Sequence, residues 1–263
     1  MAAPMIAFEH VSKSFDGRTP AVDDLSLTVQ AGEFVALVGG SGSGKTTTLK
    51  MINRLIAPSA GEIRVAGEPV QATAAHLLRR RIGYVFQETG LFPHLTVGEN
   101  IGVTPRLLGA TRAEIAARVE DLLDLVHLPR AFAARFPAAL SGGQRQRVGV
   151  ARALAARPGV MLMDEPFGAL DPATRDALGG EYRRLHEDLG LTTVMVTHDV
   201  AEAVLLADRI VIMDAGKVRA QGAAAALLAD ADPVVRSLID TPRRQAERVR
   251  SRLAPQNASE VGA

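Results

Sequence analysis

The sequence predicts an α/β fold with a parallel sheet, and two patterns support this. Several short runs are apolar on both faces, as the buried strands of a parallel sheet are. Helical patterns lie between these runs, at 45–56, 142–156 and 172–189. Buried strands that alternate with helices indicate an α/β core. The four runs are FVALV (34–38), IGYVF (82–86), VMLM (160–163) and TTVMV (192–196).

The remaining segments suggest two additions to this core and a tail. Residues 25–29 alternate as a half-exposed antiparallel strand does, and 6–11 is a plausible neighbouring strand. Residues 208–222 indicate two strands joined by a turn at Asp214-Ala215-Gly216. Residues 91–140 carry helical patterning without a buried strand, which indicates a helical insertion. We therefore expect a core at 1–90 and 156–222, a helical subdomain at 91–155 and a tail at 223–263.

The tail sequence predicts a short Ala-rich helix and then a second helix. Thr241 is placed to cap this second helix, and Pro242 to occupy its first position. The small, polar stretch 255–263 is expected to fray.

Composition excludes several classes of protein. The 263 residues include 47% hydrophobic and 22% charged residues, which suits a globular chain with a buried core. The absence of Cys excludes disulfides, Cys-ligated zinc and thiol catalysis. A net charge of +1 gives no overall attraction to nucleic acid or anionic membrane. We find no signal peptide and no apolar run of the ~20 residues that a membrane span needs, so a membrane role would require a partner.

A phosphate-binding loop follows the first buried strand and opens a helix. Its residues fit the pattern G-x-x-x-x-G-K-[ST], whose glycines let backbone N–H groups wrap an anion at a helix N-terminus. Lys45 is expected to reach the β- and γ-phosphates of ATP, and the Thr46 hydroxyl to bind Mg²⁺. The ATP-binding set is Gly39, Gly40, Ser41, Gly42, Ser43, Gly44, Lys45, Thr46 and Thr47.

Polar residues end three other buried strands. Asp164 and Glu165 follow 160–163, His198 closes the strand at 192–196, and Gln87 follows 82–86. Ligands of open α/β sheets bind at the carboxyl ends of strands. We expect Asp164 and Gln87 to bind Mg²⁺, Glu165 to act as general base on the attacking water, and His198 to contact the γ-phosphate. The alternative is that both acids cap the following turn.

A second candidate phosphate grip, Leu140-Ser141-Gly142-Gly143-Gln144, opens another helix just before Asp164. Together the motifs resemble the ATP-binding subunit of an ABC transporter, over about residues 6–222. GGSGSGKTT is similar to its Walker A, Gln87 to its Q-loop, LSGGQ to its signature, VMLMDEP to its Walker B, GALD to its D-loop and His198 to its H-loop. The signature is the specific part, because a phosphate loop alone is shared by many kinases and GTPases.

The resemblance implies a P-loop NTPase (RecA-like) core with an antiparallel β subdomain and an inserted helical subdomain. It also implies two chains in a head-to-tail dimer with ATP and Mg²⁺ at the seam. The signature residues Ser141, Gly142, Gly143 and Gln144 would then grip the γ-phosphate held by the other chain's Lys45. Asp171 would couple the two sites. Phe15 occupies the place of the family's adenine-stacking aromatic, unless it is a core residue.

More narrowly, TTTLKMINRLI (46–56) and neighbouring segments resemble importers of osmoprotectants such as glycine betaine, choline or carnitine. This implies a transmembrane permease, a separate solute-binding protein, and a place on the cytoplasmic face of the inner membrane. The permease would dock at 87–101 through exposed Leu91 and Phe92, unless these two side chains pack internally.

Three alternatives stay open. One is an ABC importer of another solute, such as an amino acid, a metal or a sulfonate. A second is a soluble ABC ATPase on nucleic acid or the ribosome, which Arg79-Arg80-Arg81 and the tail arginines could serve. Nucleic acid is not the expected partner, because such runs are more often solvated or salt-bridged faces. The third is a P-loop kinase.

Overall fold

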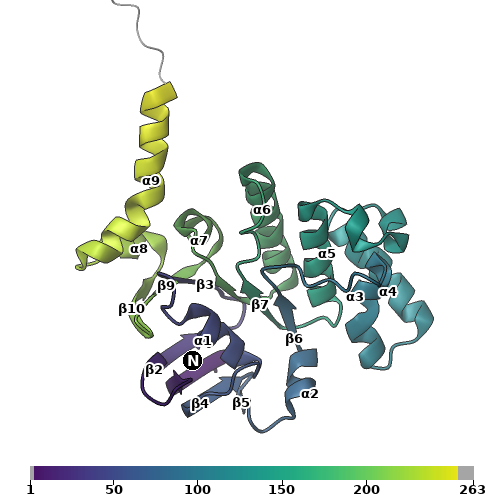
Figure 1. Ribbon diagram of the computed structural model, residues 1–263, viewed down its shortest axis with the longest axis horizontal. Coiled ribbons are helices and arrows are strands. Elements are labelled where there is room, and N and C mark those ends of the chain that lie inside the picture. The colour runs from purple at the N-terminus through teal and green to yellow at the C-terminus, as the bar shows by residue number, and fades with distance from the viewer. Residues whose placement is uncertain (1–2, 254–263) are drawn as a thin grey trace, which may run out of the picture.

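The computed structural model describes residues 3–253 and consists of two sheets, a group of helices at one side and a long C-terminal helix (Figure 1). The expected fraying of 255–263 lies outside the described residues. The strands are β1 (Ile6–Ser14), β2 (Pro20–Val29), β3 (Phe34–Val38), β4 (Ala60–Val65), β5 (Glu68–Pro69), β6 (Ile82–Val85), β7 (Val160–Asp164), β8 (Thr192–Val196), β9 (Arg209–Asp214) and β10 (Lys217–Gly222).

The helices lie around the larger sheet, in the segment between β6 and β7, and in the tail. They are α1 (Lys45–Ile52), α2 (Ala75–Arg80), α3 (Val97–Leu107), α4 (Arg112–Leu125), α5 (Gly142–Leu154), α6 (Pro172–Leu189), α7 (Val200–Leu206), α8 (Ala224–Leu228) and α9 (Pro233–Leu253). Two 3₁₀ turns, Arg130–Ala134 and Pro137–Ala139, lie between α4 and α5.

The larger sheet has the order β10-β9-β3-β8-β7-β6, and all its neighbouring strands except β10 and β9 pair in parallel. The smaller sheet, β2-β1-β4-β5, is antiparallel. The α/β prediction with an antiparallel addition is therefore confirmed. Because β3, β6, β7 and β8 run in parallel, their carboxyl ends lie at one edge of the sheet. The phosphate loop and the polar strand ends share this edge.

Two hydrophobic cores cover the two faces of the larger sheet. Along β3, Phe34 and Ala36 belong to the core shared with the helices α5, α6 and α7, whereas Val35 and Leu37 belong to the core shared with α1 and the antiparallel sheet. All five residues of β3 are buried, because a strand covered on both faces needs apolar side chains on each. This packing holds the end of β3, and so the phosphate loop, in a fixed place.

The helical subdomain consists of α3, α4 and α5, and each of these helices begins with a reciprocal capping box. Thr96 pairs with Glu99, Thr111 with Glu114, and Ser141 with Gln144. In each box the hydroxyl accepts from the third helical N–H, while the longer side chain accepts from the cap's own N–H. The sequence therefore fixes where these helices begin, including the start of α5 at the signature.

The predicted helix start at Thr241-Pro242 is wrong. Helix α9 begins at Pro233 and continues through Pro242. Val235 and Ile239, at its start, are buried in the core, so tertiary packing sets where the helix begins. The Thr241 hydroxyl donates to the Ser237 carbonyl at 2.8 Å, and Arg244 donates to the same oxygen at 2.9 Å. These bonds support the turn that contains the proline.

A buried histidine gives the fold a predictable response to acid. His186 of α6 packs against the ring of Phe34, and its Nδ1 lies 3.0 Å from the Thr193 hydroxyl. Burial, with nearby Arg183, lowers its pKa below the ordinary 6.5. The unfolded chain therefore takes up this proton first as pH falls, so the stability that neutral His186 provides is present above about pH 6.5 and lost below it.

We expect the free energy of unfolding by urea to fall as the pH drops below about 6.5, and to fall less steeply in His186→Gln. His76→Gln, at an exposed position of α2, is the control and should keep the wild-type slope. Equal slopes in wild type and His186→Gln would assign the acid sensitivity to other groups.

Candidate active site

The phosphate loop leaves the N-terminus of α1 without a side-chain cap. Gly44 is the N-cap residue, and no side chain within residues 3–253 caps the first turn, whereas α3, α5, α6 and α7 each have such a cap. Gly44 has φ +97°, and a Cβ there would lie 2.4 Å from the Ala21 carbonyl oxygen, so no other residue fits without a shift. An uncapped helix start of this kind binds anions through its free N–H groups.

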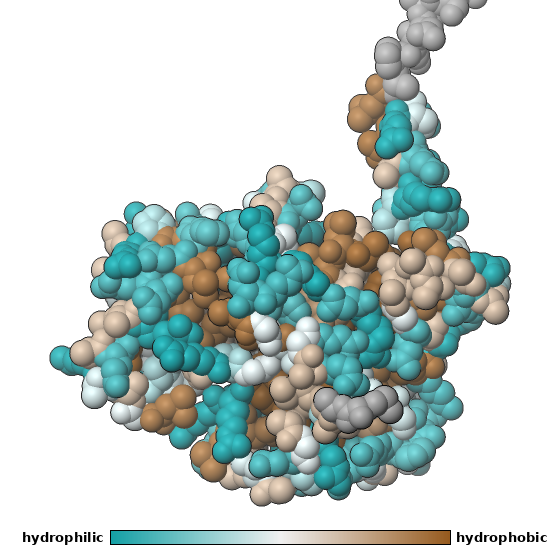
Figure 2. Space-filling view, turned by 180° about the vertical axis from the view of Figure 1, so that it is seen from behind, coloured by the Kyte–Doolittle hydropathy of each residue, from teal (hydrophilic) through white to brown (hydrophobic). Residues whose placement is uncertain are grey.

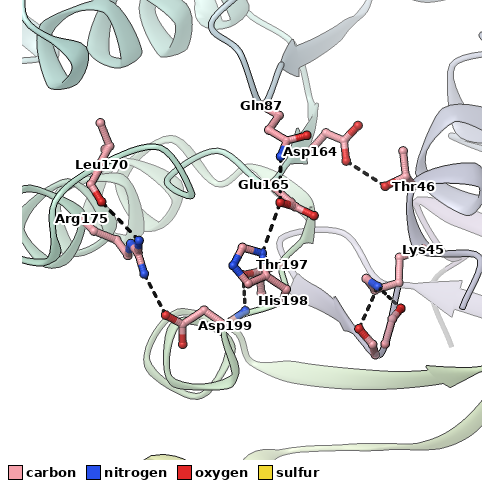
Figure 3. A network of polar contacts seen from close by, with 12 residues as sticks. Lys45, Thr46, Gln87, Asp164, Glu165, Leu170, Arg175, Thr197, His198 and Asp199 are labelled. Atoms are coloured by element: carbon pink, nitrogen blue, oxygen red, sulfur yellow. Dashed lines mark hydrogen bonds and ion pairs between the residues drawn. The ribbon is translucent and has the colours of Figure 1, made fainter. Parts of the chain in front are cut away.

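Lys45 lies within this loop, 7% exposed. Its Nζ donates to the carbonyls of Gly39 at 2.8 Å and Gly40 at 2.7 Å, and lies 3.3 Å from the Ser43 hydroxyl (Figure 3). Burial lowers the Lys45 pKa, and the charges of Glu165 and Asp164 oppose that shift. Gly40, Ser41 and Gly42 at the loop tip are exposed, and Thr47 is half-buried on α1.

Asp164 and Thr46 place two oxygens side by side. The Thr46 hydroxyl donates to Asp164 Oδ1 at 3.1 Å, across 118 positions of sequence. The other carboxylate oxygen, Oδ2, accepts from Tyr84 at 3.2 Å and lies 3.6 Å from Lys50 Nζ. Burial and the charge of Asp164 raise the pKa of Tyr84. Tyr84 therefore stays a donor that holds the carboxylate towards Thr46.

The donor set suits magnesium. Thr46 and Asp164 offer a hydroxyl and a carboxylate oxygen, and Gln87 uses its amide nitrogen on Glu165, which leaves its carbonyl oxygen for another partner. Mg²⁺ prefers hard oxygen ligands and keeps several waters, so few protein donors are needed. The sequence interpretation missed Tyr84 and Lys50. The sequence could have indicated Lys50, because it follows Thr46 by four residues and so lies on the same face of α1.

Glu165, Gln87 and His198 converge from the ends of three strands (Figure 3). Glu165 Oε2 accepts from Gln87 Nε2 at 3.0 Å and lies 3.2 Å from His198 Nδ1. The backbone of Glu165 has φ +46°, a strained conformation for a residue with a side chain, and its N–H donates to Val196 O at 2.9 Å. Within the described residues, neither acidic side chain bonds to the turn that follows, so the capping alternative has no support.

The signature residues lie away from this cluster in the same chain. Ser141 caps α5 by accepting from Gln144 N at 3.3 Å, and Gln144 Oε1 accepts from Ser141 N at 3.0 Å. Gly142 is exposed and Gly143 packs near Thr174. Figure 1 shows α5 on the far side of α6 and β7 from α1. The structure therefore gathers Lys45, Thr46, Gln87, Asp164, Glu165 and His198, but does not bring Ser141 to Gln144 to them.

Asp171 begins α6, and its carboxylate accepts from Thr174 N at 3.0 Å. Hydrogen bonds from Thr174 lower the pKa of Asp171, which keeps the side chain ionised. One turn on, Arg175 pairs with Asp199 at 3.0 Å and donates to Leu170 O at 3.2 Å. These contacts connect the start of α6 to the segment that carries His198 (Figure 3).

Three other expected contact residues, Phe15, Phe92 and Leu91, differ in their exposure. Phe15 is 67% exposed, with Lys13 Nζ 5.1 Å from its ring centroid, so it is not a core residue. Phe92 is 43% exposed and lines a groove of about 390 Å³ together with Phe86. Leu91, in contrast, packs against the core, so its predicted exposure is wrong. Arg152 holds this segment by donating to Thr89 O and Gly90 O.

Comparison with known proteins decides the family. The model of the family described as "ABC transporter" matches residues 22–168, more than half of the chain. The chain belongs to the ABC transporter family. As an ABC protein it is 56% identical over 218 residues to the glycine betaine uptake system ATP-binding protein YehX of Escherichia coli. It is 52% identical over 214 residues to the carnitine transport ATP-binding protein OpuCA of Listeria monocytogenes.

The matches to these ABC relatives cover 83% and 81% of this chain, and 70% and 54% of the relatives, so the chain spans little more than half of the second. Among solved structures, the dimeric ATP-binding cassette MJ0796 bound to ADP and Pi is 35% identical, with a TM-score of 0.74, and covers 83% of this chain and 98% of that one. The chain is an ATPase of the ABC type, with the cassette fold of this family.

Proposed function

We propose that the chain hydrolyses ATP to power the import of a quaternary-amine osmoprotectant through a separate membrane permease. The observation that carries this proposal is the cluster at the sheet edge, where an uncapped α1, Lys45 and Glu165 meet. The cargo class rests on the relatives named for uptake of glycine betaine and carnitine. The geometry of this cluster supports ATP hydrolysis, and the named relatives suggest which class of solute that hydrolysis moves.

In this proposal, the N–H groups of 39–46 and Lys45 bind the β- and γ-phosphates. Thr46, Asp164 and Gln87 hold Mg²⁺, which when bound neutralises phosphate charge. Glu165 accepts the proton of the attacking water. Gln87 and His198, at 3.0 and 3.2 Å from its carboxylate oxygen, keep that oxygen in position. His198 also lies at the place where the γ-phosphate would be contacted.

We further propose that two chains form the complete site. The signature residues 141–144 cannot serve their own Lys45, because α5 lies beyond α6 (Figure 1). A head-to-tail dimer would bring them to the partner's phosphates, with Asp171 between the two sites. The exposed ring of Phe15 is available to stack on adenine. The dimeric cassette with 35% identity supports this arrangement.

The permease is expected to dock on the groove that contains Phe86 and Phe92, whose exposed rings suit an interface. A separate solute-binding protein would deliver the cargo, and the chain would lie on the cytoplasmic face of the inner membrane. Within residues 3–253, no helix has the length and apolarity to span a membrane. Arg79 donates to Asn53 O and Arg54 O, so it is used within the chain, which does not favour the nucleic-acid alternative.

Uptake of labelled glycine betaine and choline tests the cargo. Cells that lack the chain should regain uptake with wild type and not with Glu165→Gln, because the variant keeps the fold and loses the base. Labelled sulfate and proline serve as control solutes. Equal uptake in complemented and uncomplemented cells would contradict the osmoprotectant assignment, but the assignment as an ATPase would stand.

A further inference from the structure

A cavity of about 610 Å³ lies between the helical subdomain and the ATPase core. The end of α4, one face of α5 and one face of α6 form its walls, and Phe167, two residues after Glu165, lies at its floor. On the face of the molecule that Figure 2 shows, hydrophobic side chains lie between hydrophilic ones in the region of α5 and α6. The nucleotide cluster is at the sheet edge and contributes none of the lining residues, so this is a separate site.

A buried polar group borders the cavity without a partner. Gln146 of α5 is 3% exposed and lines the cavity, and within the described residues its Nε2 has no hydrogen-bond acceptor. Buried amide donors are normally bonded, because an unmade hydrogen bond costs free energy. If the Gln146 amide group is rotated by half a turn, its oxygen takes the position of Nε2 and is then the atom without a partner. With the amide turned in this way, an ammonium group that reached it from the cavity would donate to the oxygen and satisfy it.

Carboxylates outnumber basic side chains around the cavity, and its walls are apolar. Four carboxylates line it together with Arg147 and Arg184, and among them Asp124 pairs with Arg130 and Glu181 with Arg147. The other two, Asp121 and Asp188, have no ion pair in the part of the chain that the structure describes. Leu125, Val150 and Leu185 supply apolar wall. This combination suits an organic cation with an apolar body, since the charge stays near carboxylates and the body leaves water.

We propose that this cavity binds a small organic cation with an apolar body, and that binding regulates the ATPase. Arg147 already joins the two walls, because it donates to Val126 O at 2.8 Å and pairs with Glu181 of α6. Helix α5 begins at the signature, so the separation of α5 and α6 sets where Ser141 to Gln144 lie relative to the core. A ligand between the helices resists any change in that separation and slows hydrolysis.

Binding is tested with three matched probes on the purified wild-type chain without nucleotide: 4-phenylbutylamine, 4-phenylbutanol and 4-phenylbutyrate. Calorimetry should show saturable binding of the amine, about tenfold weaker binding of the alcohol and none of the carboxylate, because the three share the phenyl group and differ in the charge and hydrogen bonding of the head group. The amine should also lower the MgATPase rate. No saturable binding of the amine, or equal binding of the carboxylate, would overturn the site, and an unchanged rate with the amine bound would overturn its regulatory role.

Two pairs of variants on α6 locate the site. Leu185→Trp fills the cavity, whereas Leu189→Trp adds the same ring at an exposed position that does not line it. Asp188→Lys reverses a rim charge, whereas Asp176→Lys makes the same change away from the cavity. The first member of each pair should bind the amine about tenfold more weakly, and the second should bind as wild type does. Because the chain has no Trp, indole emission shows whether each Trp variant is folded. Equal binding by all four variants would place the amine elsewhere.

Discussion

Glu165→Gln is expected to bind ATP, to hydrolyse it about 10²–10⁴-fold more slowly than wild type, and to persist as a dimer in MgATP. The amide has the size of the carboxylate and its oxygen can still accept from Gln87 Nε2, now at 3.0 Å from Glu165. It cannot take a proton from water. The bound nucleotide therefore stays intact at the dimer seam, where hydrolysis would otherwise let the two chains separate.

Three measurements check this expectation: phosphate release under saturating MgATP, nucleotide retained on the protein, and mass in solution by light scattering. Glu68→Gln is the control, because Glu68 is exposed on β5 and remote from the sheet edge that carries the site. It should match wild type in all three. A Glu165→Gln protein that stays strictly monomeric in MgATP would count against the dimer, and a wild-type rate would exclude Glu165 as the base.

The site could be predicted from the sequence because parallel strands place their ends together. β3 and β8 have the bounds that their apolar runs predicted, and so does α6. A polar residue directly after each run must therefore lie at one edge of the sheet. Sheet geometry alone therefore predicts that Gln87, Asp164 and Glu165 lie beside the phosphate loop. Local pattern and sheet geometry suffice where both faces of a strand are buried.

The features that the sequence did not show depend on contacts between residues that are far apart in the chain. The support of Asp164 by Tyr84 joins residues 80 positions apart, and no local pattern marks it. The Thr-Pro pair in α9 gave a local helix-start signal, but burial of Val235 and Ile239 moved the start to Pro233. Strands β4 and β5 and helix α2 were not foreseen, because they are short and only partly buried. In each case tertiary packing outweighed propensity.

The signature gives the second prediction, which tests whether the two phosphate grips work in trans. Lys45→Ala and Gly142→Asp should each abolish hydrolysis as pure proteins, and an equal mixture should regain activity. Lys45→Ala removes the ammonium from the loop. Gly142→Asp puts a negative charge where a γ-phosphate would sit, while the fold tolerates it. Among the described residues, a Cβ at Gly142 meets only Leu170 Cδ2, at 3.8 Å, and an acid in the first turn of α5 favours the helix.

The mixture should reach up to about a quarter of the wild-type rate, because random pairing makes half of the dimers mixed and each mixed dimer has one intact site of two. Gly142→Ala, which adds the Cβ without the charge, is the control and should keep most activity. Thermal unfolding of Gly142→Asp at or above the wild-type temperature separates lost chemistry from lost structure. If the mixture stays inactive while both variants fold and bind to each other, Lys45 and the signature do not form one site across two chains. Recovery would mean that ATP itself is part of the interface, since neither chain alone completes the grip on its γ-phosphate.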